Sequence, residues 1–323
     1  MEIFKSNKVY NFMGSRLPFL GLSSILFIAS IVLLITKGLN FGIDFAGGTI
    51  VQVKYEKVAP ISDIRHVLAK KPKYENAIIS KFGSDKEVVI RLSGTSSDLS
   101  TDISDRITKV LAPTGKFEIR RVDIVGPKVG GELREKGIMA LTLSIIVILI
   151  YVSFRFEWRF AIASILALIH DITIAMGAIS LFSVEVNLDI LAALLTLLGY
   201  SLNDTIIVFD RIREGIQTSK ETIIEKIVNE SVSKTLSRTT LTSLTTFFVV
   251  VTLFAFGGEI IHGFAFTLVV GIIVGTYSSI FIAASFLVQL KFSILGFRAK
   301  EAEKVKRQKE KERMRAMYEK GTV

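Results

Sequence analysis

The chain has 323 residues, is 50% hydrophobic and carries a formal net charge of +10, with a mean hydropathy of +0.50 and no cysteine. The lack of cysteine excludes disulfides, thiolate catalysis and cysteine-based metal sites. The three histidines are scattered, so we expect neither a metal nor a cofactor. Several apolar runs approach or exceed the length of about 18 residues that crosses a bilayer, which predicts a polytopic α-helical membrane protein.

Six apolar stretches are candidate transmembrane helices. The first follows a short N-terminal arm, residues 1–16. At 17–36 it is too long for the apolar core of a cleavable signal peptide, and we interpret it as a retained span. The other five fall within residues 138–290, at 138–154, 160–184, 190–209, 240–256 and 264–290.

Lysine and arginine predict the orientation, because positive residues stay on the cytoplasmic side. They gather before the first span, between the second and third, between the fourth and fifth, and after the sixth. The loops 184–189 and 257–263 contain none. Both termini, the loop 210–237 and the tail 291–323 are therefore predicted to be cytoplasmic, and the long segment 37–137 to lie outside.

The basic tail mixes glutamates with its lysines and arginines and has no interleaved aromatic residues. A solvated tail, helical or disordered, that fixes the topology is the first interpretation. Contact with lipid, the ribosome or a partner subunit is the alternative. Nucleic-acid recognition is not expected.

The outside segment, 37–137, has the pattern of a small α+β domain. It predicts strands at 48–56, 76–83, 87–93 and 115–127, with helices at 61–71 and 96–113. The second helix has one apolar face, made of Leu99, Ile103, Ile107, Val110 and Leu111. The order β-α-β-β-α-β is that of a ferredoxin-like fold. Without a catalytic constellation, the domain is expected to bind or to move rather than to catalyse.

Two glycine-rich pieces flank this domain, "FGIDFAGG" at 41–48 and "VGPKVGGEL" at 125–133. The first lacks the lysine–serine/threonine ending of a phosphate-binding loop. We interpret its glycines as hinge or tight-packing positions.

The fourth span contains a carboxylate, Asp204, about 9 Å inside the edge that Asp210 marks. A charge at such a depth costs at least ~2.5–3.5 kcal/mol and normally has a partner. Arg238, near the start of the antiparallel fifth span, reaches a similar depth, and we expect it to pair with Asp204. Hydroxyl and amide groups lie near both residues, notably Asn203, Thr205 and Thr239. Two functions remain open for the pair, a static helix lock and a carboxylate that takes up and releases a proton.

His170 and Asp171 lie in the middle of the third span. Because adjacent helical residues point about 100° apart, we expect that they do not share one partner. Structural satisfaction and a relay role both remain open. Gly271 and Gly275 in the sixth span form a GxxxG motif that favours close helix packing. Glu185 and Asp189 at the outside edge are expected to be solvated.

Four motifs in the right order on the six spans give the sequence a family resemblance. They are "FGIDFAGG", "VGPKVGGEL", "GYSLNDTIIVFDRIRE" and "LSRTTLTSLTTF". Together they resemble the SecF family, the small partners of SecD in the bacterial and archaeal protein-export machinery. The residues that carry the first two motifs of the family are Asp44, Gly47, Gly48, Gly126 and Pro127.

The resemblance implies an architecture and a function. Such proteins pair with SecD into a 6+6 helix unit of the resistance-nodulation-division type in the cell inner membrane. They use the proton motive force late in secretion, at the SecYEG channel, and are not enzymes. The implied partners are SecD, SecYEG, YajC, YidC, the translocating preprotein and membrane lipids. In that family the aspartate of "NDT" and the arginine of "RTT" are implicated in proton passage, and these are Asp204 and Arg238 here.

Two alternative functions remain open at this stage. The chain could be a structural scaffold of the translocase that carries no protons, with Asp204 and Arg238 as its lock. It could also be half of an exporter of lipids or small molecules, although such proteins usually have larger outside domains.

Overall fold

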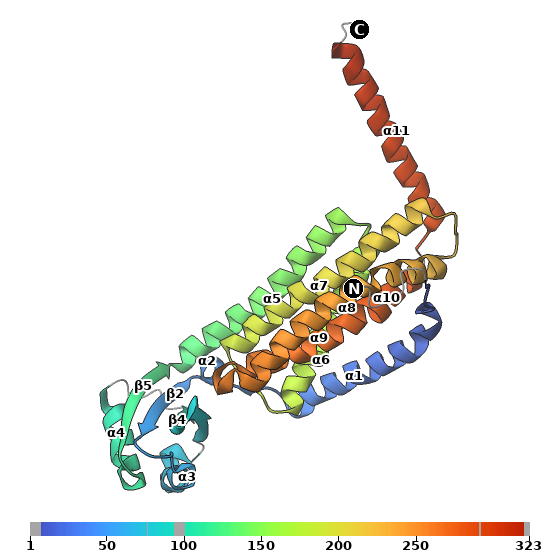
Figure 1. Cartoon of the computed structure of the whole chain (residues 1–323). Coiled ribbons are helices and arrows are strands. Elements are labelled where there is room, and N and C mark those ends of the chain that lie inside the picture. Colours follow the sequence, from blue (N-terminus) through green and yellow to red (C-terminus); the bar gives the residue numbers. More distant parts are fainter. Residues whose placement is uncertain (1–7, 76, 94–100, 291, 320–323) are drawn as a thin grey trace.

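The computed structural model describes residues 8–75, 77–93, 101–290 and 292–319. These form a helix bundle with a sheet domain at one end and a long helix, α11 (Ile294–Glu319), leaving the other end (Figure 1). Six helical segments within these described ranges are long and apolar enough to cross a membrane, as predicted. They are α1 (Arg16–Thr36), α5 (Pro127–Arg155), α6 (Trp158–Leu181), α7 (Leu188–Thr218), α8 (Ile224–Phe256), and α9 (Gly258–Ser278), which continues through the π-helical turn η4 (Ser279–Ala283) into α10 (Ala284–Gln289).

Several of these helices are longer than their apolar runs. Helix α5 begins at Pro127 rather than at 138, because proline suits the first helical position, where no N–H donor is needed. Helices α7 and α8 are joined by residues 219–223, so most of 210–237, expected as a loop, is helical. Hydropathy detects only the part of a helix that meets lipid and misses its polar extension.

The sheet domain, expected to lie outside, has the predicted β-α-β-β-α-β order. Its elements are β2 (Gly48–Tyr55), α3 (Ile61–Ala69), β3 (Ile78–Phe82), β4 (Ser84–Ser93), α4 (Thr101–Leu111) and β5 (Phe117–Val125). The strands form an antiparallel sheet in the order β3-β4-β2-β5, the arrangement of a ferredoxin-like fold. Leu99, predicted on the face of the second helix, lies outside the described residues.

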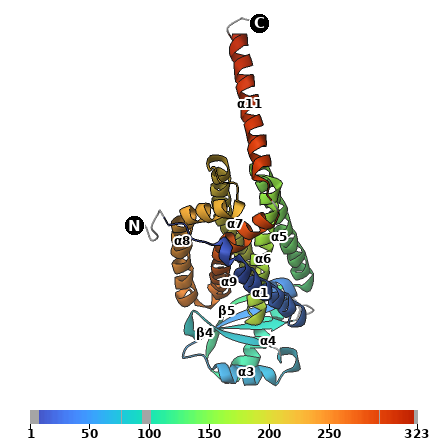
Figure 2. The same cartoon turned by 90° about the vertical axis from the view of Figure 1, so that its right-hand side faces the viewer.

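The alternation of β2 explains how the sheet is covered. Val51, Val53 and Tyr55 point to one face and are buried, because successive side chains of a strand alternate between faces. They pack with one-sided apolar positions of α3 and α4, including Ile64 and Ile107. Figure 2 shows the sheet between these two helices and the membrane bundle.

A short two-stranded element joins the sheet domain to the bundle. After α1, strand β1 (Asn40–Phe41) pairs in parallel with β6 (Glu185–Val186), and α2 (Ile43–Ala46) follows. The sequence pattern did not predict this pair. Single 3-10 turns complete the elements, η1 (Met13–Ser15), η2 (Pro72–Tyr74) and η3 (Ala112–Thr114).

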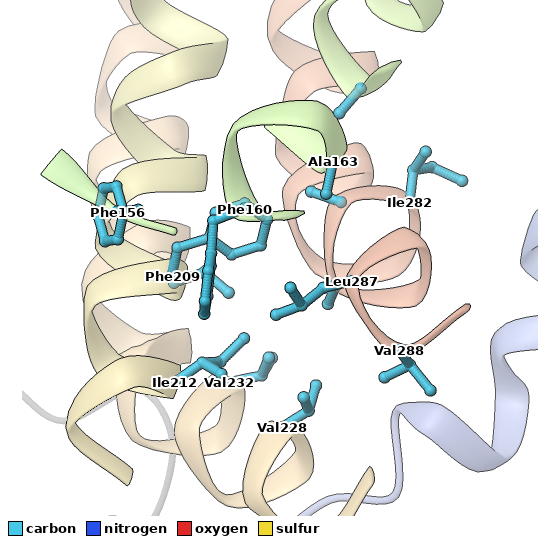
Figure 3. Packing of buried hydrophobic residues seen from close by; sticks show 14 of the residues in the cluster. Phe156, Phe160, Ala163, Phe209, Ile212, Val228, Val232, Ile282, Leu287 and Val288 are labelled. Carbon is cyan, nitrogen blue, oxygen red and sulfur yellow. The ribbon is translucent and has the colours of Figure 1, made fainter. Parts of the chain in front are cut away.

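The end of the bundle far from the sheet domain has its own apolar core. Phe160 on α6 is fully buried and meets Phe209 edge-on, with ring centroids 5.1 Å apart. Figure 3 shows Phe160 beside Phe209, with Ile212 and Val232 below them. This cluster joins α6, α7, α8 and α10 and fixes how the helices rotate against one another.

The segment before α1 and the first turn of α11 are both attached to this same region. The backbone N–H of Met13 donates to Asn229 Oδ1 on α8 over 2.8 Å. In α11 the Arg298 guanidinium donates to the carbonyls of Ile216, Ser219 and Glu221, where α7 ends. These carbonyls lack helical partners, so a cation is favoured there. Arg298 therefore holds the base of α11 against the bundle.

Candidate functional site

Asp204 is buried inside the helix bundle. It lies on α7 with only 1% of its surface exposed, and Ser243 Oγ on α8 donates to its Oδ2 over 3.0 Å. Among the described residues it has no ion-pair partner. A buried carboxylate with a hydroxyl partner and no cation can change its protonation without breaking a salt bridge.

Asp204 and Arg238 do not form the expected pair in this structure. Arg238 lies on α8 but is exposed, and it has no ion pair with any described residue. Asn203 is also exposed, whereas Thr205 and Thr239 are buried. The site residues therefore divide into an inner group around Asp204 and an outer group on the surface of the bundle.

The hydroxyl-rich side of α8 is mostly self-contained. Thr239, Thr242 and Thr245 donate to backbone carbonyls three or four residues earlier on the same helix. Such bonding satisfies a hydroxyl within its own helix. Ser243 differs, because its hydroxyl crosses to α7. The sequence pattern identified the hydroxyl-rich helix but not which hydroxyl contacts the carboxylate.

A second buried carboxylate, Asp171 on α6, lies in a denser network. Ser201 on α7 and Ser278 on α9 both donate to its Oδ2, over 2.5 and 2.7 Å. His170 Nδ1 lies 2.8 Å from Asp171 Oδ1. The two neighbours bond directly to each other, but they have no third partner in common among the described residues, since Asp171 accepts from Ser201 and Ser278 and His170 contacts Tyr277.

The network continues from His170 to α1. Tyr277 OH on α9 lies 3.2 Å from His170 Nε2, and Ser23 Oγ on α1 lies 2.9 Å from Tyr277 OH. Ser23, Tyr277 and Ser278 were not predicted from the sequence. The run "TYSS" directly after the GxxxG motif was the available signal, since hydroxyls gathered in an apolar helix need partners.

The GxxxG motif brings α7 and α9 together at this network. A Cβ added to Gly271 would lie 2.5 Å from Leu197, and one added to Gly275 would lie 3.3 Å from Ser201. The two glycines favour this close approach, which places Ser201 against Asp171. Ser201 and Asp204 are three residues apart on α7, so one helix side contributes to both carboxylate sites.

The two glycine-rich motifs pack against each other where the sheet domain meets α5. Gly47 has a positive φ of 76°, and a Cβ there would lie 2.8 Å from the Cα of Pro127. A Cβ at Gly48 would lie 2.5 Å from the carbonyl oxygen of Leu92. Gly126 precedes α5 as its N-cap. The backbones of the domain and of α5 are therefore in direct contact.

The same junction contains acidic side chains with defined partners. Asp44 Oδ2 accepts from the N–H of Leu188 at the start of α7, where an anion is favoured. Glu185, expected to be solvated, is half-buried and pairs with Arg91 of β4 at 3.3 Å. Burial raises the pKa of Glu185 above its usual value, Arg91 opposes the rise, and Asp44 adds to it.

Comparison with known proteins gives matches along most of the chain. A family model described as "Protein export membrane protein SecD/SecF, C-terminal" matches residues 106–293, and a "SecD/SecF GG Motif" model matches residues 32–57. A protein translocase subunit SecF from Helicobacter pylori is 46% identical over 323 residues, covering 100% of both chains. SecF from Calditerrivibrio nitroreducens is 50% identical over 90% of this chain and 97% of its own.

A solved structure is also similar. The crystal structure of SecDF, a translocon-associated membrane protein from Thermus thermophilus, aligns with a TM-score of 0.80 at 36% identity. The alignment covers 90% of this chain and 40% of the SecDF chain, so this chain spans less than half of that protein.

Proposed function

The chain belongs to the SecD/SecF family of protein-export membrane proteins, and we propose that it couples proton movement to late steps of preprotein translocation as the SecF subunit of the translocase. The observation that carries this proposal is the burial of Asp204 within α7, where it accepts a hydrogen bond from Ser243 and, within the described part of the chain, meets no cation. A charge inside a membrane protein is costly, and its position marks a functional site.

The exposed polar residues near Asp204 indicate that a partner subunit completes the site. Arg238 and Asn203 are exposed on the bundle surface, although they belong to segments that cross the membrane. An arginine facing hydrocarbon is costly, so we propose that a SecD subunit covers this surface. The similar SecDF chain is long enough to contain both halves, since this chain matches 40% of it.

In this proposal the proton binds at Asp204 and leaves again as the two halves rock against each other. The partner brings Asp204 and Arg238 into contact in one of the two states. Asn203, Thr205 and Thr239 line the path of the proton. Protonation removes the charge at Asp204 and with it the attraction to Arg238. The outside domain moves with the bundle, because its backbone packs directly on α5 through Gly47.

The proposal also covers placement and partners. The chain lies in the inner membrane with both termini cytoplasmic, the sheet domain (37–137) outside and the basic tail (291–323) inside. SecYEG and the translocating preprotein are its further partners, with YajC, YidC and lipids at the periphery. It holds no cofactor and is not an enzyme.

The test is export by the reconstituted complex with and without a proton motive force. Asp204→Asn keeps the size and the hydrogen bonding of the side chain but cannot exchange a proton. We expect it to lose the part of export that depends on the proton motive force. Asp210→Asn on the same helix is the matched control. It should retain proton-dependent export, because the ion pairs of Asp210 with Arg155 and Arg213 are exposed. Unchanged proton-dependent export in Asp204→Asn overturns the proposal.

A scaffold without proton transport is the second candidate, and the Asp204–Ser243 hydrogen bond that joins two helices is the observation that favours it. Co-purification separates the two. If Asp204→Asn releases the partner subunit, Asp204 is a lock. If the complex stays intact and idle, Asp204 carries the proton.

A further inference from the structure

A chain of hydrogen bonds connects Asp171 to helix α1, and the proposed function does not use it. It runs Asp171–His170–Tyr277–Ser23 and joins α6, α9 and α1. His170 is 7% exposed, and Asp171 is fully buried. The chain therefore connects a buried titratable pair to the first helix.

Helix α1 is attached to the bundle in an unusual way. Of its residues only Ser23 and Ser30 are buried, although the helix is strongly apolar. Ser30 lies against Gly177 of α6, where an added Cβ would lie 2.2 Å from its hydroxyl oxygen. Ser23 contacts Tyr277. The two serines thus pack together with the half-buried Phe19, Leu20 and Phe27, and this face holds the helix whose C-terminal end leads through β1 into the sheet domain.

We propose that His170 and Asp171 form a second proton-binding site, and that its protonation state reaches the sheet domain through Tyr277, Ser23 and helix α1. The inference rests on the proposed use of protons by this complex. It assigns a role to α1 and to α6 that the Asp204 site does not require.

The donors and acceptors allow two consistent arrangements. With neutral His170, Nδ1–H donates to Asp171, Nε2 accepts from Tyr277 OH, and Tyr277 accepts from Ser23. A proton arriving at Nε2 makes that nitrogen a donor. Tyr277 must then accept from His170 and turn its own hydrogen to Ser23 Oγ. Ser23 in turn directs its hydrogen to a carbonyl of the preceding turn of α1.

The proton added at Nε2 stays on the imidazole, and no covalent bond breaks elsewhere. The pair changes from a net charge of −1 to 0. The hydrogen bond that holds α1 reverses its direction at the same time. Departure of the proton from Nε2 restores the first arrangement.

Two further observations point to this chain. Both Ser23 and His170 line a cavity of about 290 Å³ between α1, α6 and α10, so packing does not seal the pair on that side. The π-helical turn Ser279–Ala283 directly follows Tyr277 and Ser278. Such turns are rare and often lie at functional sites, since they redirect side chains that a regular helix would point elsewhere.

The other charged and titratable groups near the pair are few. Helix α9 contributes Tyr277, and α7 contributes Ser201 with Asp204 one turn further along. The α1 residues at the cavity are Leu20, Ser23, Ser24, Phe27 and Ile28, none of which titrates near neutral pH, and Ile282 and Phe286 of η4 and α10 are apolar. A pH response of α1 is therefore assigned to His170 and Asp171. The variant Asp204→Asn tests whether Asp204, the remaining carboxylate nearby, contributes to that response.

The experiment measures the position of α1 directly. Because the chain contains no cysteine, paired spin labels can be placed at Ile35→Cys on α1 and Phe182→Cys after α6, both exposed positions. The complex with its SecD partner is reconstituted in lipid, and the label distance is recorded across pH. We expect the distance distribution to change with pH, and Asp171→Asn to abolish the change.

The relay is tested with matched pairs. Tyr277→Phe and Ser23→Ala should abolish the response or shift its midpoint by about one pH unit. Tyr151→Phe, an exposed tyrosine on α5, and Ser24→Ala, the exposed neighbour of Ser23, should leave it unchanged. A label distance that does not depend on pH, or a response whose size and midpoint are unchanged in both relay variants, overturns the inference.

The two proposals fail separately. Asp204→Asn should abolish proton-dependent export and keep the pH response of α1. If export is unaffected by Asp204→Asn while the label response follows His170, the proposed function fails and the second proton site stands.

Discussion

Ser243 on α8 donates a hydrogen bond to Asp204 on α7 over 3.0 Å, while Arg238, five residues before Ser243, is exposed on the same helix. Five residues correspond to about 500° of helical rotation, so the two side chains point about 140° apart. One side of α8 thus satisfies the carboxylate within this chain. The other side presents a cation at the surface that a partner subunit would cover.

The Ser243 hydroxyl should stabilise the chain, because it satisfies a buried acceptor. Removing it in Ser243→Ala is expected to lower the free energy of unfolding by about 1–3 kcal/mol, measured by denaturation in detergent. Thr252→Ala is the control, because its hydroxyl bonds within α8, to the Phe248 carbonyl, and is exposed. Equal stability of the two variants would contradict the role of Ser243.

Arg238 should matter for the complex but not for the isolated chain. Arg238→Ala is expected to change the stability of the isolated chain by less than about 0.5 kcal/mol, since the side chain is exposed and unpaired among the described residues. In the complex it should reduce proton-dependent export. Destabilisation of the isolated chain as large as that of Ser243→Ala would show that Arg238 acts within the chain.

Glu185 should make stability depend on pH. Burial raises its pKa above the ordinary value of 4.5, so the folded chain binds this proton more tightly than the unfolded chain does. The stabilisation is fully present below that ordinary value and is lost as pH rises through the raised pKa. Glu185→Gln should therefore flatten the fall in melting temperature above pH 4.5, whereas Arg91→Ala should extend it to higher pH.

The control for that series is Glu118→Gln, an exposed carboxylate on β5. It should leave the pH profile of the melting temperature unchanged. A profile in Glu185→Gln identical to that of the unmodified chain would show that the Arg91–Glu185 pair does not contribute to this pH dependence.

Gly47 should tolerate no side chain. Its positive φ and the 2.8 Å approach of a built Cβ to Pro127 Cα predict that Gly47→Ala costs about 1–3 kcal/mol and loosens the sheet domain from α5. Limited proteolysis at the junction and the melting temperature measure the effect. Gly131→Ala, where an added Cβ meets nothing within 4 Å, is the matched control. Loss of stability in both variants would contradict the close contact as the cause.

The sequence predicted those features that depend on periodicity and length. Six spans and the β-α-β-β-α-β order follow from runs of apolar residues and from alternation, which local chemistry determines. The separation of two residues along one helix axis was also predictable, because each helical residue advances by a fixed rise. The rotation of α8 was not, since it depends on the packing of Val228 and Val232 against Phe209 and its neighbours. Arg238 was therefore expected beside Asp204 and lies elsewhere.

The missed parts of the site depend on tertiary contacts. Glu185 was expected to be solvated because nothing in its local sequence predicts that β6 pairs with β1. In that pair Glu185 lies opposite Asn40, which is 145 residues earlier in the chain. Tyr277 and Ser23 are 254 residues apart. No spacing rule joins such positions, and hydroxyls in apolar helices give only the general signal that partners exist.

The central claim is that Asp204 carries the proton, and proton flux is its most direct test. Proteoliposomes with the complex of this chain and SecD, driven by a translocating preprotein, should show proton uptake with a pH-sensitive dye. The account predicts that Asp204→Asn abolishes this flux while the complex stays assembled and Asp210→Asn retains it. A flux of the same size in Asp204→Asn would contradict the account.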